Sequence, residues 1–326
     1  MKILTSFPKA FLKRYEVVFG HETFQEIMKG FATKRHTWFR INTLKGNAEQ
    51  VYAELRAENV VFHQSDLLQD ACWVEGSERD SLLASTVFRN RTIYVQGFAS
   101  QLPVRFLDVV PGLKILDLAA APGSKTIQIA GLSNPEDEIA AVEVVRKRKF
   151  KLQDNLSLNG AGYIRVFLQD GTNVWKYRPE YFDRVLLDAP CSSEGRFQLD
   201  EESSFEFWSA SKVKEMVRKQ RRLLFSAVHA LKPGGTLVYS TCALSPQENE
   251  GAVDYLFKTF GDCLEVQAID LDVVERMKPI EQNRKKEYHP AVRESCRLMP
   301  SERTEGFFVC KIKKTATSNP PLKFKR

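Results

Sequence analysis

Two cysteines stand where a run of apolar residues stops, a position from which a thiol can act as a nucleophile. Val185–Leu187 leads into Asp188, Pro190 and Cys191, and Leu237–Ser240 leads to Cys242. Each apolar run predicts a buried strand, and the proline breaks the first one. A single Asp-Ala-Pro-Cys segment is more often a turn with a buried cysteine. Two thiols at two strand ends indicate chemistry, because open α/β sheets bind ligands at the carboxyl edge.

Carboxylates end three earlier predicted strands, at Asp117, Glu143 and Asp170. An acid at the second strand end suits ribose hydroxyls, and one at the third can accept from an adenine amine. Each acid alone is more often a helix cap or a surface residue, but three at successive strand ends favour a nucleoside ligand. A turn of small residues follows Asp117 and leads into Lys125, comprising Ala119, Ala120, Ala121, Pro122, Gly123 and Ser124.

That turn lets a ligand approach the backbone closely, and the helix that follows offers unpaired N–H groups. It has neither the Gly-x-Gly-x-x-Gly nor the Gly-x-x-x-x-Gly-Lys pattern, which disfavours dinucleotide and triphosphate binding.

Strands and helices alternate from about residue 85, which predicts an α/β doubly wound sheet. The predicted strands are 114–118, 139–142, 163–168, 184–187, 236–240, 264–269 and 306–313, with helices at 126–130, 146–159 and 211–231. Lys232-Pro-Gly-Gly235 should end the last helix. We therefore expect one domain over 85–314 and a disordered basic tail over 315–326.

Residues 1–84 predict a separate small α+β unit. Helical apolar spacing near 7–28 precedes an alternating strand at 37–45, with Arg40 and Asn42 expected to point outward, a helix at 48–58 and a strand starting at 60–62. Residues 1–45 contain nine Lys and Arg against three Asp and Glu. This bias suggests a polyanionic partner, and its interleaved aromatic residues suit single-stranded RNA. A solvated face around core aromatics would give the same composition.

Composition excludes several classes of protein. The chain has 326 residues, a net charge of +7 and 43% hydrophobic residues, and its apolar runs are too short for a membrane helix. The amino terminus does not resemble a secretory signal. Six cysteines without CxxC spacing, and five histidines without metal-ligand spacing, predict neither disulfides nor a metal site. We expect a cytoplasmic protein without membrane contact, acting as a monomer.

Three segments resemble the Nop/Sun family of RNA cytosine-5 methyltransferases, namely 119–126, 188–195 and 240–250. The similarity extends to Tyr94–Ser100, to Gly306–Phe308 and, in the amino-terminal unit, to the RNA-binding entry segment at 39–45. It covers nearly all of the chain up to about residue 313. The resemblance implies a class I methyltransferase sheet (Rossmann-like) with a small amino-terminal RNA-binding domain, and S-adenosylmethionine as cofactor.

The resemblance also implies roles. Cys242 attacks C6 of cytosine, Asp188 hydrogen-bonds N3, and Cys191 assists loss of the C5 proton and release of the enzyme. Lys125 orients Asp188 or a phosphate, although an exposed helix-start lysine is nearly as common. S-adenosylmethionine lies over Ala119–Lys125 and near Asp188, with Glu143 on the ribose, Asp170 on adenine and Arg148 in the helix after Glu143. Cys72, Cys263, Cys296 and Cys310 have no such context.

Three positions depart from the family pattern, where Ser124 and Ser193 replace glycine and Gly97 replaces aspartate. Transfer RNA is the favoured substrate because one amino-terminal unit makes a compact enzyme, with ribosomal RNA as the alternative. A non-catalytic RNA-binding assembly factor is disfavoured because both cysteines are present. A DNA methyltransferase would take its nucleophile from Pro-Cys at the fourth strand, which would make Cys191 the attacking thiol.

Overall fold

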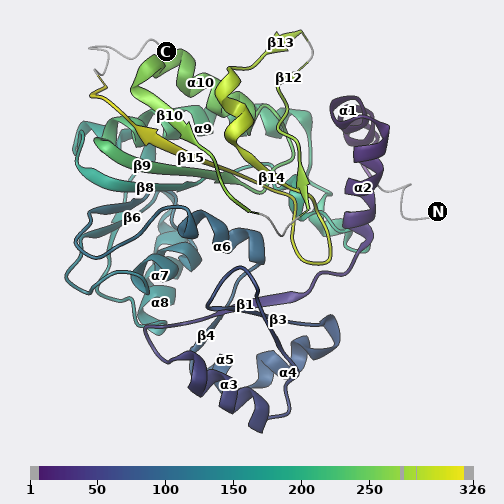
Figure 1. Ribbon diagram of the computed structural model, residues 1–326, viewed down its shortest axis with the longest axis vertical. Helices are drawn as coiled ribbons and strands as arrows, with labels where there is room; N and C mark the ends of the chain where they lie inside the picture. The colour runs from purple at the N-terminus through teal and green to yellow at the C-terminus, as the bar shows by residue number, and fades with distance from the viewer. Residues whose placement is uncertain (1–6, 272–274, 284, 319–326) are drawn as a thin grey trace.

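The computed structural model describes residues 7–271, 275–283 and 285–318, which form two large sheets, a two-stranded hairpin and the helices around them (Figure 1). The larger sheet has the order β11-β14-β15-β9-β8-β5-β6-β7, with β10 paired to β15. Its strands are β5 (Ile115–Asp117), β6 (Ile139–Glu143), β7 (Arg165–Leu168), β8 (Phe182–Asp188), β9 (Leu231–Thr241), β10 (Leu264–Gln267), β11 (Arg276–Met277), β14 (Cys296–Leu298) and β15 (Phe307–Lys314).

The strands from β7 to β9 are parallel, and β15 runs antiparallel to β9. Strand order reverses between β5 and β8, which makes the edge beyond their carboxyl ends the switch point where α/β sheets bind ligands. The predicted α/β doubly wound fold is confirmed.

Helices cover both faces of this sheet, as Figure 1 shows. On one face lie α6 (Phe98–Arg105), α7 (Ser124–Ala130) and α8 (Arg146–Leu158), whose apolar residues share a core with Ile115 and Leu186. On the other face lie α9 (Ala210–Ala230) and α10 (Glu250–Phe260), packed with Val185 and Tyr239. Because both faces are covered, the central strands β5 and β6 are buried along their whole length, whereas the edge strand β7 is mostly exposed.

The smaller sheet has the order β2-β3-β1-β4, all antiparallel, and carries α3 (Ala48–Ala57), α4 (Arg79–Ala84) and α5 (Thr86–Arg89). Its strands are β1 (Thr37–Ile41), β2 (His63–Gln64), β3 (Ala71–Val74) and β4 (Ile93–Val95). Pairing of β4 with β1 continues this sheet past residue 84. Trp38 of β1 belongs to the core that includes Phe98 of α6, so the two sheets are packed through a shared interior.

Helices α1 (Lys9–Phe19) and α2 (His21–Ala32) do not cover the smaller sheet. They meet at Gly20, whose φ of 76° is in the region that favours glycine. Their buried aromatic residues, including Phe11, pack against Phe197, Phe205 and Leu244 of the larger unit. The first helices of the chain are therefore part of the wall around the loops that follow β8 and β9. A hairpin of β12 (Gln282–Asn283) and β13 (Lys286–Glu287) lies beside α1 (Figure 1).

Three sequence predictions need correction. Arg40 and Asn42, expected to point outward, are 5% and 0% exposed. Arg40 donates to Ser124 O (3.1 Å) and Asn42 donates to Asn159 O (3.1 Å), so both join the smaller sheet to the larger unit. No strand starts at 60–62, and β2 begins at His63.

The third correction concerns the tail. Its start is not disordered, because Ser318 is buried and accepts from Lys314. Residues 319–326 lie outside the described residues.

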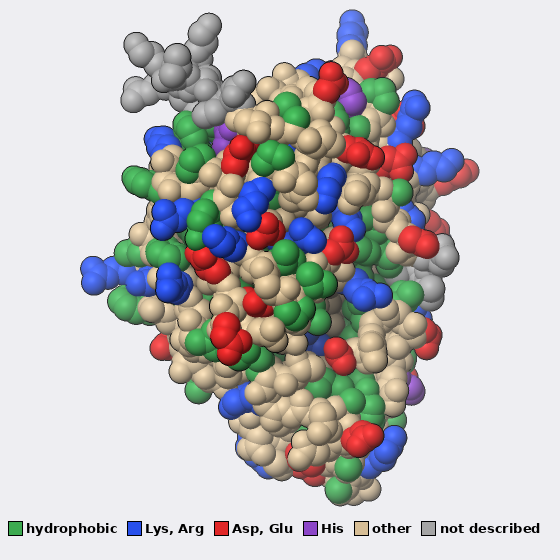
Figure 2. Space-filling model, turned by 60° about the vertical axis from the view of Figure 1, so that its left-hand side comes forward, with side chains coloured by type: hydrophobic (Ala, Val, Ile, Leu, Met, Phe, Trp, Pro, Cys, Tyr) green, Lys and Arg blue, Asp and Glu red, His purple; other side chains and the backbone are tan. Residues whose placement is uncertain are grey.

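Charge of both signs is interspersed on the face shown in Figure 2, where Lys and Arg side chains alternate with Asp and Glu. Two of the cations in the basic amino-terminal stretch are used internally: Arg40, as above, and Arg35, which donates to the carbonyls of Gly195 and Phe197. Lys34 and Lys45 are exposed. The bias of residues 1–45 is therefore partly structural. In the part of the chain that the structure describes, no helix combines the length and apolar character needed to cross a membrane.

Candidate active site

The two thiols meet at the carboxyl edge of the larger sheet. Strands β8 and β9 are parallel neighbours with Asp188 opposite Ser240, so the loops that begin with Cys191 and Cys242 leave the sheet side by side. Their Sγ atoms are 3.3 Å apart, and both side chains are partly exposed. The hydrogen bond between them lowers the pKa of Cys242 and raises the pKa of Cys191. Cys242 is therefore the thiol that ionises first.

Asp188 lies at the end of β8 and accepts hydrogen bonds at both carboxylate oxygens. Lys125 Nζ, in the first turn of α7, donates to Asp188 Oδ2 (2.5 Å) and to Ser100 Oγ (2.8 Å). Ser240 Oγ donates to Asp188 Oδ1 (2.8 Å). Lys125 is only 6% exposed, whereas the Asp188 side chain is 33% exposed. The lysine is thus not a surface residue, and it fixes the orientation of a carboxylate that solvent can reach.

The small-residue turn over 119–124 is tied down through its carbonyl oxygens. Arg148 donates to Ala121 O (2.7 Å), Asn155 donates to Pro122 O (2.9 Å), and Arg40 holds Ser124 O. Gly123 has φ 108°, and a Cβ there would meet Leu152 Cδ1 at 2.8 Å, so this position requires glycine for backbone and packing.

The three strand-end acids differ in environment. Asp117 is 1% exposed and accepts from Thr126, and burial raises its pKa to about 6. Glu143 is also buried, accepts from Val145 N (2.8 Å) and pairs with Arg148 (3.3 Å). The Asp170 side chain is 44% exposed and caps Thr172 N (3.0 Å). Asp170 and the Glu143–Arg148 pair face the edge, whereas Asp117 is enclosed and holds α7.

Two buried glutamates behind the thiols were not singled out from the sequence. Glu194 accepts from the Tyr15 hydroxyl (2.5 Å) and the Trp208 indole (2.7 Å), and its other oxygen accepts from the amides of Leu244 and Ser245. It therefore joins the Cys191 loop, the Cys242 loop and α1. The only sequence signal for a role of Glu194 was its place in the Ser-Ser-Glu-Gly segment at 192–195.

Glu248 holds the Cys191 loop from the other side. Its carboxylate accepts from Ser192 N (3.0 Å), from Ser192 Oγ and from Gln220 Nε2 (2.9 Å) of α9. Burial, together with the nearby charge of Glu194, raises the pKa of Glu248 to about 7. The loop that begins with Cys191 is thus fixed at Ser192 by one carboxylate and at Glu194 by another.

Of the three positions that depart from the family pattern, the structure explains Gly97 and gives no reason for the serines at 124 and 193. Ser193 has φ 59° and ψ 22°, a left-handed conformation that glycine adopts without strain. A Cβ on Gly97 would approach Glu305 Oε2 at 2.8 Å, so the Glu305 carboxylate fills the space beside this glycine. Ser124 begins α7 and lends its carbonyl to Arg40.

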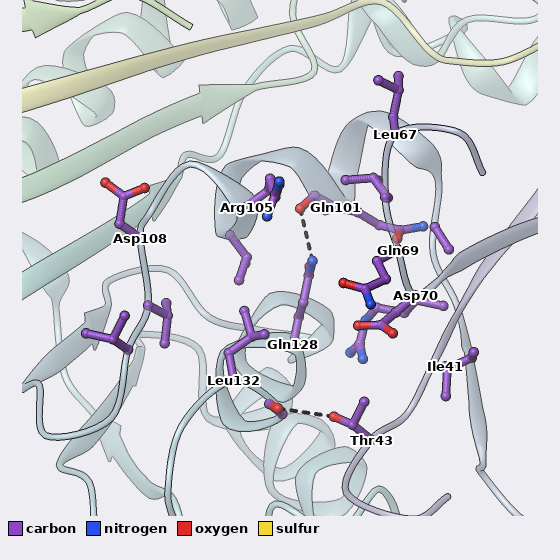
Figure 3. A pocket seen from close by; sticks show the side chains of 17 residues that line it. Ile41, Thr43, Leu67, Gln69, Asp70, Gln101, Arg105, Asp108, Gln128 and Leu132 are labelled. Carbon is purple, nitrogen blue, oxygen red and sulfur yellow. Dashed lines mark hydrogen bonds between the residues drawn. The ribbon is translucent and has the colours of Figure 1, made fainter. Parts of the chain in front are cut away.

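A cavity of about 470 Å³ lies elsewhere, between β1 and the helices α6 and α7. Figure 3 shows Gln128 donating to the Gln101 carbonyl and Thr43 donating to the Gly131 carbonyl in its wall. None of the residues singled out for chemistry lines it. Among the described residues, no group of three or more His, Cys, Asp and Glu is placed to hold a metal ion.

Comparison with known proteins identifies two regions. The family described as 16S rRNA methyltransferase RsmB/F matches residues 104–313, and the RsmF/B-like ferredoxin-like domain matches residues 7–78. The chain is 34% identical over 322 residues to Ribosomal RNA small subunit methyltransferase F of Vibrio campbellii, covering 97% of this chain. It spans only 65% of that relative's length.

Two further relatives are similar over almost their whole length. A tRNA (cytosine(49)-C(5))-methyltransferase of Pyrococcus abyssi is 37% identical, over 84% of this chain and 87% of its own. The crystal structure of a methyltransferase homolog protein from Pyrococcus horikoshii superposes with a TM-score of 0.81 at 29% identity, covering 96% of this chain and 97% of the other.

Proposed function

The chain belongs to the RsmB/F (Nop/Sun) family of methyltransferases, and from this premise we propose that it transfers a methyl group from S-adenosylmethionine to C5 of a cytosine in RNA. The observation that carries the proposal is the pair of thiols 3.3 Å apart beside Asp188 and Lys125. C5 of cytosine is a poor nucleophile, and thiolate addition at C6 makes it reactive. A single thiol would suffice for attack, whereas a second suits the later loss of the C5 proton.

The residues present fit S-adenosylmethionine. The turn over Ala119–Lys125 has mostly small side chains, so a ligand can approach its backbone closely, and Arg148 and Asn155 hold the turn by its carbonyl oxygens. Asp170 has a partly exposed carboxylate for the adenine amine, and the Glu143–Arg148 pair lies where ribose hydroxyls would bind. When bound, S-adenosylmethionine supplies an electrophilic methyl group. Asp188, exposed at the same edge, lies between this turn and the thiols.

The chain's own residues then divide the chemistry. The Cys242 thiolate forms a bond to C6, and the electron pair displaced toward N3 is neutralised by a proton on Asp188, which Lys125 can supply through their hydrogen bond. After C5 has gained its methyl group, the Cys242 sulfur is bonded to C6 and no longer carries the negative charge that helps to raise the pKa of Cys191. Cys191 loses its proton to water and then takes the proton from C5. The electron pair of the C5–H bond forms the C5–C6 double bond, the bond between Cys242 and C6 breaks with its pair leaving on the Cys242 sulfur, and N3 returns its proton to Asp188.

Transfer RNA is the proposed substrate. The relative named for a transfer RNA cytosine is 37% identical to this chain, and the Vibrio campbellii relative named for ribosomal RNA is 34% identical. Ribosomal RNA is the alternative, favoured by the description of the matched family. We place the protein in the cytoplasm as a monomer, with the unit over 1–84 contributing RNA contacts and that over 85–314 the reaction. Bisulfite sequencing of transfer and ribosomal RNA from a deletion strain separates the two substrates.

Cysteine replacement tests the reaction itself. Cys242→Ala should abolish methylation and any covalent protein–RNA adduct. Cys191→Ala should still attack and methylate, and should accumulate an adduct that survives denaturing electrophoresis and disappears in the double variant. An adduct trapped by Cys242→Ala and absent from Cys191→Ala would make Cys191 the nucleophile. RNA binding without methylation by the unaltered protein would indicate a non-catalytic assembly factor.

A further inference from the structure

A basic groove lies between α1, α9 and the β12–β13 hairpin. It consists of two adjoining cavities of about 620 and 630 Å³ that share Arg14, Gln247 and Asn283 in their walls. We call it the α1–α9 groove and define it by its cations, which are Lys13, Arg14, Lys214, Arg218, Arg221 and Lys286. Among the described residues, no Asp or Glu lines either cavity. Figure 1 shows α1 and the hairpin side by side at one end of the molecule.

Five of these six cations form no ion pair among the described residues, and the sixth, Lys286, pairs with Asp254 (2.8 Å). Within the described ranges, Lys13, Lys214 and Arg218 take part in no ion pair and are exposed. Lys214, Arg218 and Arg221 are spaced at i, i+4 and i+7, which places them along one face of α9. Like charges at this spacing repel each other and destabilise a helix unless an anion offsets them. Two acids lie near these cations, namely Asp254, which is buried and pairs with Lys286 (2.8 Å), and Glu215, three residues before Arg218. The cations outnumber these acids, and a polyanionic ligand fits this excess of positive charge.

Arg221 adds a second observation. Its guanidinium carbon lies 5.4 Å from the centre of the Tyr255 ring, and its Nε is buried without a hydrogen-bond partner among the described residues. A buried donor left unpaired costs free energy that a ligand acceptor can offset. Arg14, at the other side, donates to Gln247 and keeps its remaining N–H groups for a ligand.

Buried residues connect the wall of the groove to the loop that begins with Cys191. Gln220, beside Arg221, donates to Pro190 O (3.0 Å), and Glu248, beside Gln247, accepts from Ser192 N. Tyr15, beside Arg14, donates to Glu194. Three residues of the groove wall are thus each adjacent in sequence to a residue that holds the Cys191 loop. A polymer with its reacting unit at the thiols would reach the groove through its neighbouring units.

We propose that the α1–α9 groove binds the sugar–phosphate backbone of the substrate RNA next to the target nucleotide. This inference rests on the proposed function, and it gives RNA a second contact surface, away from the smaller sheet. Unpaired lysines and arginines along a groove follow a phosphate backbone without reading its sequence. The groove should therefore strengthen binding of any RNA that extends past the target, and leave the choice of cytosine to the residues around the thiols.

The test compares two triple variants that change net charge equally. The groove variant is Lys13→Gln, Lys214→Gln, Arg218→Gln, and the control is Lys147→Gln, Lys151→Gln, Lys219→Gln, also three exposed cations. Affinity for a transfer RNA transcript is measured by fluorescence anisotropy over a range of salt. Losing three phosphate contacts should reduce the slope of log affinity against log salt by ~2, and lower affinity on the order of 10- to 100-fold at ~0.1 M salt. The control should keep the slope of the unaltered protein.

Further measurements separate this inference from the proposed function. Shortening the RNA toward the target nucleotide should weaken binding to the unaltered protein in steps, one of which occurs when the RNA no longer reaches the groove. The groove variant should lack that step. Equal slopes for the groove variant and the unaltered protein, or equal losses in groove variant and control, would overturn the groove assignment while methylation persisted. If the unaltered protein does not methylate RNA but the groove variant still reduces the salt slope, the proposed reaction is wrong and the groove assignment stands. If polyglutamate displaces RNA from the unaltered protein and the groove variant keeps the unaltered salt slope for RNA, the groove would instead be assigned to an acidic protein partner.

Discussion

The carboxyl edge of the larger sheet has two halves that are built differently. The β8–β9 half carries both thiols, and its loops are held by buried carboxylates, Glu194 and Glu248. The β5–β7 half carries the small-residue turn, and its polar groups include the largely exposed Arg148 and Asp170. A thiol that must meet one carbon atom needs fixed loops. A site that takes up and releases a cofactor each cycle needs groups that solvent can reach.

The difference predicts where stability and chemistry are coupled. In the β8–β9 half, one substitution should lower both the free energy of unfolding and the rate of adduct formation. In the β5–β7 half, cofactor affinity should change while the fold stays intact.

The largest effect is expected for Glu194→Gln. The amide nitrogen of glutamine would face N–H or O–H donors that now point at a carboxylate, leaving buried groups unpaired. The free energy of unfolding, from urea denaturation, should fall by ~2–6 kcal/mol, because two buried donors would each lose an acceptor at ~1–3 kcal/mol. Adduct formation should slow as well. Tyr15→Phe removes a single donor and should cost only ~1 kcal/mol; equal costs for both would show that the carboxylate does not join the loops.

Glu194 also shows what the sequence could and could not predict. The strand ends, the turn over 119–125 and both cysteines can be recognised from local sequence patterns. For this reason the sequence predicted the sheet and singled out Lys125, Asp188, Cys191 and Cys242. The partners of Glu194 are 179 and 50 residues away, at Tyr15 and Leu244, and no local pattern contains them. Arg40 and Asn42 were misplaced for the same reason, because their acceptors lie 84 and 117 residues away.

The second prediction concerns pH and Glu248. Because burial raises its pKa from 4.5 to about 7, the folded state holds a proton that the unfolded state has lost. This contribution to stability is fully present below pH ~4.5 and is lost as the pH rises to about 7. Burial also raises the pKa of Asp117, to about 6, so the decline below pH ~6 has two sources. Glu248→Gln should therefore reduce the decline in the free energy of unfolding and remove the part between about pH 6 and about pH 7. The exposed Glu287→Gln serves as the control and should leave the decline unchanged; a decline between pH ~6 and ~7 that persists in Glu248→Gln would assign it to another group.

Asp170 tests the β5–β7 half. Asp170→Ala should weaken S-adenosylmethionine affinity by ~1–3 kcal/mol in calorimetry, the cost of a polar group left without its partner. It also removes the cap on Thr172 N, so stability should fall by ~1 kcal/mol or less. Asp170→Asn keeps a capping oxygen and should weaken affinity without that loss. Unchanged affinity for Asp170→Ala and for Glu143→Ala alike would remove the cofactor from this half.

The smallest effect is expected at Ser193, where the β8–β9 half keeps a strained residue. Glycine would relieve its left-handed conformation, worth ~1–2 kcal/mol, but would add freedom to the unfolded chain, worth ~0.4–1 kcal/mol. Ser193→Gly should therefore raise the free energy of unfolding by only ~1 kcal/mol, whereas Ser193→Ala should not raise it. The Ser193 hydroxyl also helps to lower the pKa of Cys242, so both variants should move the pH dependence of adduct formation to higher pH. A pH shift in Ser193→Gly that Ser193→Ala lacks would assign it to the backbone, because only the hydroxyl is lost in both.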